Sequence, residues 1–335
     1  MLIDDPKTFA VVIPTYEGTP FLRRTLDYLR HVSFMGEILI ADDSSGSDRE
    51  FALSSADRYP ELSIQVHEYP HRTRFLDKLV ESLAKSDARY VLLCGQDDFL
   101  VPDAVENLLR LLEQRPECSA ARGKVARFRL VRQTREDGSS KVKVEFSRHA
   151  MLAYEEGSAA DRVLSHIRSY TSTLYSVHRR EHLTESFRRT EASTKNVIFF
   201  QVLSSCITAS LGKIAATEDL FMIRQAHPRS WAASLVNDYE HWPLLLASPD
   251  FSRCYGEFRE VILGLLQASD AAECKRLGEA IDRAFVDLVR VSCFRENLPS
   301  AAEDAFQSRL AQPGTAARQT ADSVLEFAFA YPDTY

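Results

Sequence analysis

The chain has few glycines and prolines and no long apolar run. Twelve glycines and 13 prolines among 335 residues exclude a collagenous or low-complexity protein. The longest apolar candidate, residues 197–211, contains Gln201, Ser204 and Ser205 and is shorter than the roughly 20 residues that cross a bilayer. We therefore expect no transmembrane segment. Because no basic and apolar leader opens the chain, we expect a cytoplasmic protein that could also lie peripherally on the inner face of the membrane.

Several motifs of catalysis and binding are also absent. The six cysteines are scattered without a C-x-x-C pair, which predicts reduced core residues rather than disulfides or a zinc site. No G-x-G-x-x-G or Walker loop occurs, and no histidine is placed to activate Ser44 or Ser45 as a hydrolase nucleophile. The net charge of −7 argues against nucleic-acid binding, which depends on neutralising phosphates.

The first 130 residues show an α/β pattern. β-Branched runs that are apolar on both faces predict parallel strands, and they alternate with amphipathic segments that predict helices. Thr19 is the expected N-cap of the first helix, with Pro20 at its first position. The expected strands are residues 10–13, 37–41, 62–66 and 90–94, and the helices begin near residues 19, 75 and 102.

The rest of the chain is less regular and then becomes helical. We expect a β-hairpin at residues 127–146, a short strand at 174–177, a buried helix at 196–211 stopped by Gly212, and a second hairpin at 214–223. From about residue 239 only helical patterns occur, at 261–266, 281–291, 301–310 and 324–329. The expected fold class is a mostly parallel α/β sheet flanked by helices, with a C-terminal helical appendage.

Polar residues follow three of the predicted strands. Pro14-Thr15-Tyr16-Glu17 follows the first, the segment 42–48 follows the second, and Gly95-Gln96-Asp97-Asp98 follows the fourth. Ligands of open α/β sheets bind beyond the carboxyl ends of the strands, so these segments predict one binding crevice.

Three blocks in this order carry a family resemblance: VVIPTYE (11–17), ILIADDSSGSD (38–48) and YVLLCGQDDFLVPDAV (90–105). Together they resemble the family-2 glycosyltransferases of GT-A fold, which transfer a sugar from a nucleotide donor. The resemblance covers residues 8–130 well and continues more loosely to about 235. It implies a catalytic domain at 1–235, with a nucleotide half at 8–130 and an acceptor half at 131–235. Residues 236–335 would form a helical region for acceptor binding or self-association.

The resemblance also implies a nucleoside site. Thr15, Tyr16 and Glu17, after Pro14, would line the base and ribose pocket, and Asp43 would accept a hydrogen bond from the imide N–H of uracil. A carboxylate only accepts hydrogen bonds, so it favours a base that has an N–H donor at the contacting edge. Uracil has such a donor, which predicts a UDP-sugar as the substrate. The simpler interpretation of residues 42–45 is a turn rich in capping side chains, in which Asp42 braces the loop.

Asp97 and Asp98 correspond to the family's acidic metal motif. Carboxylates could not face a diphosphate unless a cation lay between them, and Mn²⁺ or Mg²⁺ meets that need. Lys78 lies where the family places a polar pair beside the nucleotide, although its position on an amphipathic helix equally suits plain solvation. Arg224, His227 and Arg229 form a basic cluster that resembles a lid over the diphosphate, and it is also consistent with a solvated hairpin end.

The catalytic base is the open question. An inverting transfer needs a carboxylate to deprotonate the acceptor hydroxyl. In the family this carboxylate stands at the start of a buried helix, and the resemblance implies that Asn196 occupies that position. Asparagine cannot accept the proton. Glu191 on the loop before the helix is one alternative, and Glu218 or Asp219 in the second hairpin is another.

The sequence thus predicts a metal-dependent, inverting hexosyltransferase of polysaccharide biosynthesis, acting on a glycan, lipid-linked or protein acceptor and able to self-associate through its C-terminal helices. A non-catalytic nucleotide-sugar-binding or scaffold protein is the alternative, motivated by Asn196 and Gln96. A sugar nucleotidyltransferase is disfavoured because its Gly-rich phosphate loop is missing.

Overall fold

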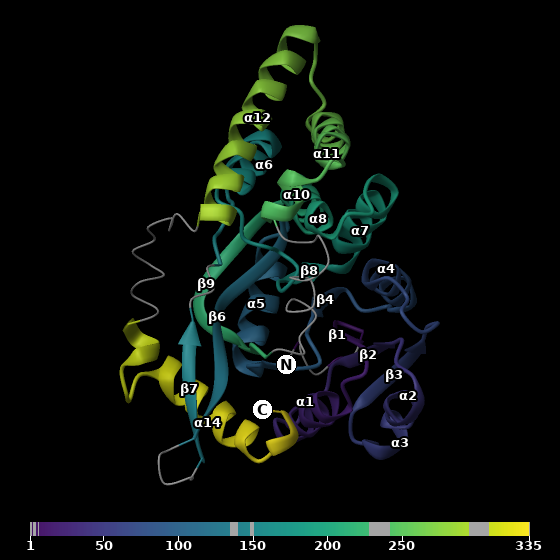
Figure 1. The fold of residues 1–335 in the computed structure, drawn as a ribbon, viewed down its shortest axis with the longest axis vertical. Coiled ribbons are helices and arrows are strands. Elements are labelled where there is room, and N and C mark those ends of the chain that lie inside the picture. The colour runs from purple at the N-terminus through teal and green to yellow at the C-terminus, as the bar shows by residue number, and fades with distance from the viewer. Residues whose placement is uncertain are drawn as a thin grey trace.

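A computed structural model describes residues 2, 5, 7–134, 140–147, 151–227, 242–294 and 308–334 of the chain. Its centre is a nine-stranded sheet (Figure 1) in which the strand order is β3-β2-β1-β4-β8-β6-β9-β5, with β7 paired to β6. The strands are β1 Phe9–Thr15, β2 Glu37–Asp42, β3 Ser63–Glu68, β4 Tyr90–Leu93, β5 Asp98–Leu100, β6 Cys118–Thr134, β7 Ser140–Ser147, β8 Val177–Arg179 and β9 Lys213–Gln225.

Helices flank this sheet and follow it in the chain, which confirms the expected fold class. They are α1 Thr19–His31, α2 Gly46–Leu53, α3 Ser55–Arg58, α4 Phe75–Lys85, α5 Pro102–Gln114, α6 Ala159–Arg168, α7 Arg180–Ser193, α8 Val197–Leu211, α10 Trp242–Ala247, α11 Phe251–Leu266, α12 Ala271–Phe294, α14 Ala316–Phe329 and the 3₁₀ turn η3 Pro332–Thr334. Within the described ranges, no helix combines the length and apolarity that a bilayer crossing requires.

The N-terminal half of the sheet is parallel. β1 pairs in parallel with β2 and β4, and β2 pairs in parallel with β3. Strands β1, β2 and β4 are almost wholly buried, as their apolar runs predict. The four predicted strands are therefore confirmed. One local detail was wrong: Gly18, not Thr19, is the N-cap of α1, and Thr19 and Pro20 open the helix.

The second half of the sheet is mixed. β6 runs parallel to β9 but antiparallel to β7 and β8, and β5 runs antiparallel to β9. The hairpin of β6 and β7 is confirmed, and the short strand expected at 174–177 begins only at Val177. The prediction of a second hairpin was wrong, because residues 213–225 form one strand. The polar residues 217–219 lie within this strand, where its pairing with β6 shifts register.

Two glycines permit close approaches in this half. A Cβ on Gly123 would lie 2.3 Å from the Asp219 carbonyl oxygen of β9, and one on Gly212 would lie 2.7 Å from the Ser119 backbone nitrogen. Gly212 ends α8 in an extended conformation with φ −176°, rather than in the left-handed cap that we expected. Contact with β6, not helix capping, thus requires glycine at position 212.

The C-terminal helices pack against two different cores. Helices α10, α11 and α12 share a hydrophobic cluster with α6 and α8, and in Figure 1 α11 and α12 project from one end of the molecule. Helix α14 instead joins the cluster of α1, α5 and the sheet. Of the helix expected at 301–310, residues 301–307 lie outside the described residues. The division at residue 235 stays a prediction.

Five cysteines are free in the described part of the chain. Cys94, Cys118, Cys206 and Cys254 are buried, as expected for core residues, but Cys274 is exposed, so the expectation of a core position was wrong for it.

Candidate active site

The carboxyl ends of β1 and β2 meet in a hydrogen-bonded polar loop. The strand register places Thr15 beside Asp42. Asp42 Oδ1 accepts hydrogen bonds from Thr15 Oγ1 and from Ser44 Oγ, both at 2.7 Å. Ser44 Oγ in turn accepts the backbone N–H of Glu17 at 2.8 Å. Asp42 therefore braces the two loops through Oδ1, while its Oδ2 is buried and has no hydrogen-bond partner among the described residues.

Asp43 forms a buried ion pair with Lys78 of α4. Lys78 Nζ contacts Asp43 Oδ1 and donates to the Thr15 carbonyl at 3.0 Å, and each side chain is only 4% exposed. Burial raises the pKa of Asp43 while Lys78 opposes that shift, and burial lowers the pKa of Lys78. Of the two interpretations of Lys78, plain solvation was wrong, because α4 packs this position against the ends of β1 and β2. Its place beside the nucleotide stays a prediction.

The rim of this site is formed by Tyr16, Glu17, His71 and Arg72. Tyr16 is 39% exposed, and its ring lies 5.6 Å from that of His71. Glu17 and Arg72 have φ values of 44° and 63°, a left-handed conformation that is uncommon for residues other than glycine. His71 was not predicted from the sequence, although it lies in the polar loop that precedes α4. This rim offers an exposed aromatic face beside the buried Asp43–Lys78 pair.

Asp97 and Asp98 are both engaged by the end of β9. The antiparallel register places Asp98 opposite Arg224, whose Nε lies 2.9 Å from Asp98 Oδ2. His227 Nε2 lies 2.9 Å from Asp97 Oδ2. Asp98 is fully buried, and burial raises its pKa while Arg224 opposes that rise. The sequence placed these four residues in one site, and the structure brings them into direct contact.

Further side chains hold the end of β9 in place. The Arg224 guanidinium lies 3.6 Å from the centre of the Tyr175 ring, and the His227 ring stacks on Phe21 at 4.2 Å. Arg24 of α1 donates to Gln225 Oε1 at 2.5 Å and to the Asp97 carbonyl at 2.9 Å. The sequence analysis missed this arginine, although its place among the apolar residues of α1 was a usable signal.

The acidic pair has features that fit a divalent cation. Asp97 Oδ1 and Asp98 Oδ2 converge over Gly95, 2.5 Å and 2.9 Å from the point where a side chain there would place its Cβ. Asp98 Oδ1 is buried and has no hydrogen-bond partner among the described residues. No group of three metal-ligating side chains occurs in the described ranges, so phosphate and water would complete the coordination, as is usual for Mg²⁺.

The candidate bases Glu191 and Asp219 lie in α7 and β9. Glu191 is in α7, not in a loop as expected, and it pairs with Lys195 at 2.5 Å and Arg74 at 3.4 Å. The pKa of Glu191 is lowered, chiefly by its hydrogen bond from Lys195. Asp219 is exposed in β9, five residues before Arg224, a separation of roughly 16 Å along a strand.

The remaining predicted residues have clear positions. Asn196 is the N-cap of α8, and its Oδ1 accepts the N–H groups of Ile198 at 3.0 Å and Phe199 at 3.1 Å. Glu218 forms ion pairs with Lys124 and Arg309. Arg229 lies outside the described residues. Asn196 thus has a structural reason to be asparagine that is independent of catalysis.

Known structures share this fold. The chain matches the S. aureus TarS fragment 1–349 with a TM-score of 0.52 and 13% identity, covering 90% of this chain and 77% of that one. The same fragment in complex with UDP-GlcNAc matches with a TM-score of 0.54 and 14% identity, covering 89% and 78%. No curated protein sequence matches.

The family assignment comes from the sequence itself. The model described as "Glycosyl transferase family 2" matches residues 10–183, which is more than half of the chain and contains all three blocks. This match confirms the resemblance and, with the similar structures, the GT-A-like fold. The chain belongs to glycosyl transferase family 2 and is a glycosyltransferase that uses a nucleotide-sugar donor.

Proposed function

We propose that this enzyme transfers a sugar from a UDP-sugar, with inversion, to a hydroxyl of a glycan, lipid-linked or protein acceptor in polysaccharide biosynthesis. The observation that carries the proposal is the set of carboxylates after β2 and β4, the two strands that flank β1: Asp43 paired with Lys78, and Asp97 and Asp98 over Gly95. The similar fold of TarS, which was solved with UDP-GlcNAc, supports a uridine donor. The proposal includes a cytoplasmic enzyme whose C-terminal helices serve acceptor binding or self-association.

The nucleoside would bind between the rim and Asp43. Lys78 holds Asp43 Oδ1, which orients the carboxylate so that its other oxygen can accept the imide N–H of uracil. The exposed Tyr16 ring offers a face for the base, and Glu17 offers acceptors for ribose hydroxyls. Pro14 and Thr15 shape the floor, since the Thr15 carbonyl receives Lys78.

The diphosphate would lie over Gly95. Asp97 and Asp98 would hold Mn²⁺ or Mg²⁺, which when bound would supply Lewis-acid stabilisation of the leaving diphosphate. Arg224 forms an ion pair with Asp98 in this structure, and His227 contacts Asp97. A diphosphate is an alternative anionic partner for both side chains, so the end of β9, with Arg229 beyond it, is proposed as a lid that exchanges its carboxylate contacts for phosphate contacts.

Glu191 is the proposed base and Asp219 the weaker candidate. Glu191 lies against Arg74, at the start of the helix that carries Lys78, whereas Asp219 contacts Asn107 of α5. A base must remove the acceptor proton as the hydroxyl attacks the anomeric carbon, opposite the leaving phosphate. The lowered pKa of Glu191 keeps it ionised, and release from Lys195 would increase its basicity.

Calorimetric titration of UDP, GDP and their sugar derivatives, with and without Mn²⁺, tests the donor and the metal together. We expect UDP compounds to bind more tightly with Mn²⁺, and Asp98→Ala to abolish that difference and to lower donor turnover about a hundredfold or more. Asp103→Ala is the matched control, since Asp103 is exposed in the first turn of α5. Normal turnover in Asp98→Ala would refute the metal site. Mn²⁺-dependent UDP binding without turnover of any donor would instead favour a non-catalytic binding protein.

A further inference from the structure

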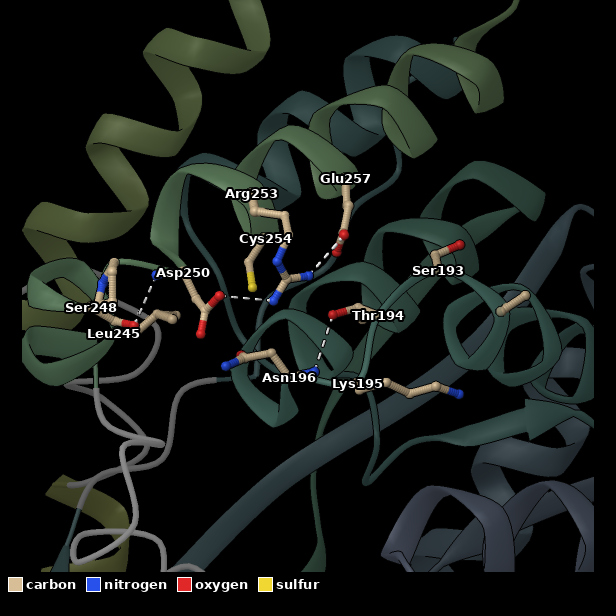
Figure 2. Close-up of a pocket in the computed structure, with 12 residues that line it drawn as sticks. Ser193, Thr194, Lys195, Asn196, Leu245, Ser248, Asp250, Arg253, Cys254 and Glu257 are labelled. Atoms are coloured by element: carbon tan, nitrogen blue, oxygen red, sulfur yellow. Dashed lines mark hydrogen bonds and ion pairs between the residues drawn. The ribbon is translucent and has the colours of Figure 1, made fainter.

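A cavity with both polar and apolar lining opens on the helical side of the molecule. It has a volume of about 810 Å³ and lies between the end of α7, the start of α8, and helices α10 and α11 (Figure 2). This volume is within the range of about 300–1,000 Å³ typical of small-molecule sites. Neither the nucleoside site nor the acidic pair contributes a side chain to it.

Exposed ion pairs line one wall of the cavity. Arg253 of α11 contacts Glu257 at 2.9 Å and Asp250 at 3.3 Å, and these three side chains are 39–66% exposed (Figure 2). A carboxylate only accepts hydrogen bonds and a guanidinium only donates them. A sugar hydroxyl does both, so such a wall can satisfy several neighbouring hydroxyl groups at once.

The end of α7 and the loop after it line another part of the cavity. Ala192, Ser193 and Thr194 are small and uncharged there, and Lys195 adds one charged group. Leu245 and Pro249 add apolar surface. Small side chains leave room for a ring, and apolar groups suit its C–H faces. The lining therefore has the composition of a site for a polar but uncharged ring.

Charge in the cavity is balanced, which selects against anions. Among its lining residues, Lys195 and Arg253 are matched by Asp250 and Glu257. The start of α8 offers little to a phosphate, because Asn196 already accepts the N–H groups of Ile198 and Phe199. A nucleotide or a phosphorylated ligand would thus find no uncompensated positive group here.

Helix α7 connects the lining of the cavity to the donor side through side-chain contacts. Glu191 precedes the lining residue Ala192 and contacts Arg74, the residue before α4. One turn further along α4, Lys78 contacts Asp43 and the end of β1. A ligand in the cavity would therefore lie on the far side of Glu191 from the nucleoside site.

We propose that this cavity binds the acceptor, and that the bound part of the acceptor is a neutral carbohydrate. The inference rests on the proposed transfer function, since it identifies the second substrate of the same enzyme. Helices α10 and α11 then have a defined role: with the ends of α7 and α8 they form the acceptor site.

The test uses the full chain on an array of immobilised neutral and anionic oligosaccharides. We expect binding to neutral glycans, a loss of about tenfold or more in Ala192→Trp, which fills the cavity, and a comparable loss in Arg253→Gln. The matched controls are Ala272→Trp and Arg276→Gln, two exposed positions of α12 outside the cavity, and both should bind as the parent does.

Titration of each variant with UDP separates this inference from the proposed function. Ala192→Trp should retain the UDP affinity of the parent chain, which also shows that the variant is folded. Equal glycan binding by Ala192→Trp and its control, a preference for anionic glycans, or no glycan binding would overturn the neutral-acceptor site. Failure of the parent chain to bind UDP would instead refute the proposed function, whatever the array shows.

Discussion

Charged side chains at the strand ends differ in burial and in pairing from those around the cavity. At the strand ends they are buried and paired across distant parts of the chain, as in Lys78 with Asp43 and Arg224 with Asp98. Around the cavity they are exposed and paired within one helix turn, as in Arg253 with Glu257. Both regions have balanced charge, but only the first has removed that charge from water.

This difference predicts where stability and binding are coupled. Removing one partner of a buried pair leaves an uncompensated charge, which costs about 3–5 kcal/mol. Removing one partner of an exposed pair costs about 0–1 kcal/mol. Substitutions in the buried pairs should thus change folding and ligand binding together, whereas substitutions in the exposed pairs around the cavity should change ligand binding alone.

Lys78→Met should have the largest effect on stability. It leaves the Asp43 carboxylate buried without its cation, so we expect the free energy of unfolding in urea to fall by about 3–5 kcal/mol. Lys85→Met, at an exposed position of the same helix, is the control and should change little. The double variant Lys78→Met/Asp43→Leu should recover most of the loss. An unchanged unfolding midpoint in Lys78→Met would show that the pair is not buried in solution.

The core around α6 should lose stability at acidic pH, because this helix carries a buried histidine. His166 is fully buried between Tyr154 and Tyr170, and both of its ring nitrogens lack hydrogen-bond partners among the described residues. Burial, with a smaller contribution from Arg122, lowers its pKa from 6.5 to about 3. The unfolded chain therefore binds the proton first. The contribution of neutral His166 to the free energy of unfolding is fully present above pH 6.5. It falls by up to about 1.4 kcal/mol per pH unit as the pH drops from 6.5 towards 3.

His166→Phe should reduce this slope, measured by urea unfolding at pH 7, 6 and 5. The slope will not vanish, because His178 is also buried with its pKa lowered to about 4 and adds a loss of the same sign. His31→Phe, at an exposed position of α1, should leave the slope unchanged. Equal slopes in His166→Phe and the parent chain would contradict the buried neutral state.

Local patterns predicted the strands and the strand-end segments, but not the partners of the charged residues. The run 37–41 is apolar on both faces, which requires a buried strand whatever its neighbours are. Lys78 lies on an amphipathic helix at a position where a charged residue is usual. Asp43 is 35 positions earlier in the chain, and only the path of β2 brings it into contact with Lys78. Burial of an ion pair depends on such long-range contacts, so the helix pattern alone could not decide between a lysine in the nucleotide site and a solvated one.

Two further errors have the same origin. The polar residues 217–219 predicted a turn, yet β9 continues through them because register shifts against β6 accommodate the irregularity. Glu191 was assigned to a loop because its segment is polar, but no glycine or proline ends the helix there, and α7 continues to Ser193. A run of polar residues does not by itself end a helix or strand whose other face packs against the core.

Asn196→Ala should have a moderate effect. It removes the acceptor of two N–H groups at the start of α8, so the free energy of unfolding should fall by about 1 kcal/mol. Asn196→Asp keeps the cap and should unfold as the parent does. If Asn196→Ala were as stable as the parent, or if Asn196→Asp raised turnover, the residue would be more than a cap.

Glu191→Gln should have the smallest effect on stability and the most informative effect on activity. Its pairs with Lys195 and Arg74 are exposed, so the unfolding free energy should change by less than about 1 kcal/mol. As the proposed base it should nevertheless lower kcat by about 10²–10⁴ and remove the acidic limb of the pH–rate profile, with UDP affinity unchanged. Glu185→Gln, which breaks comparable pairs with Arg188 and Arg189 two turns earlier in α7, should retain activity. If both variants turned over donor equally well, the base would have to be sought elsewhere, first at Asp219, and the stretch of α7 between nucleoside site and cavity would serve only to position the acceptor.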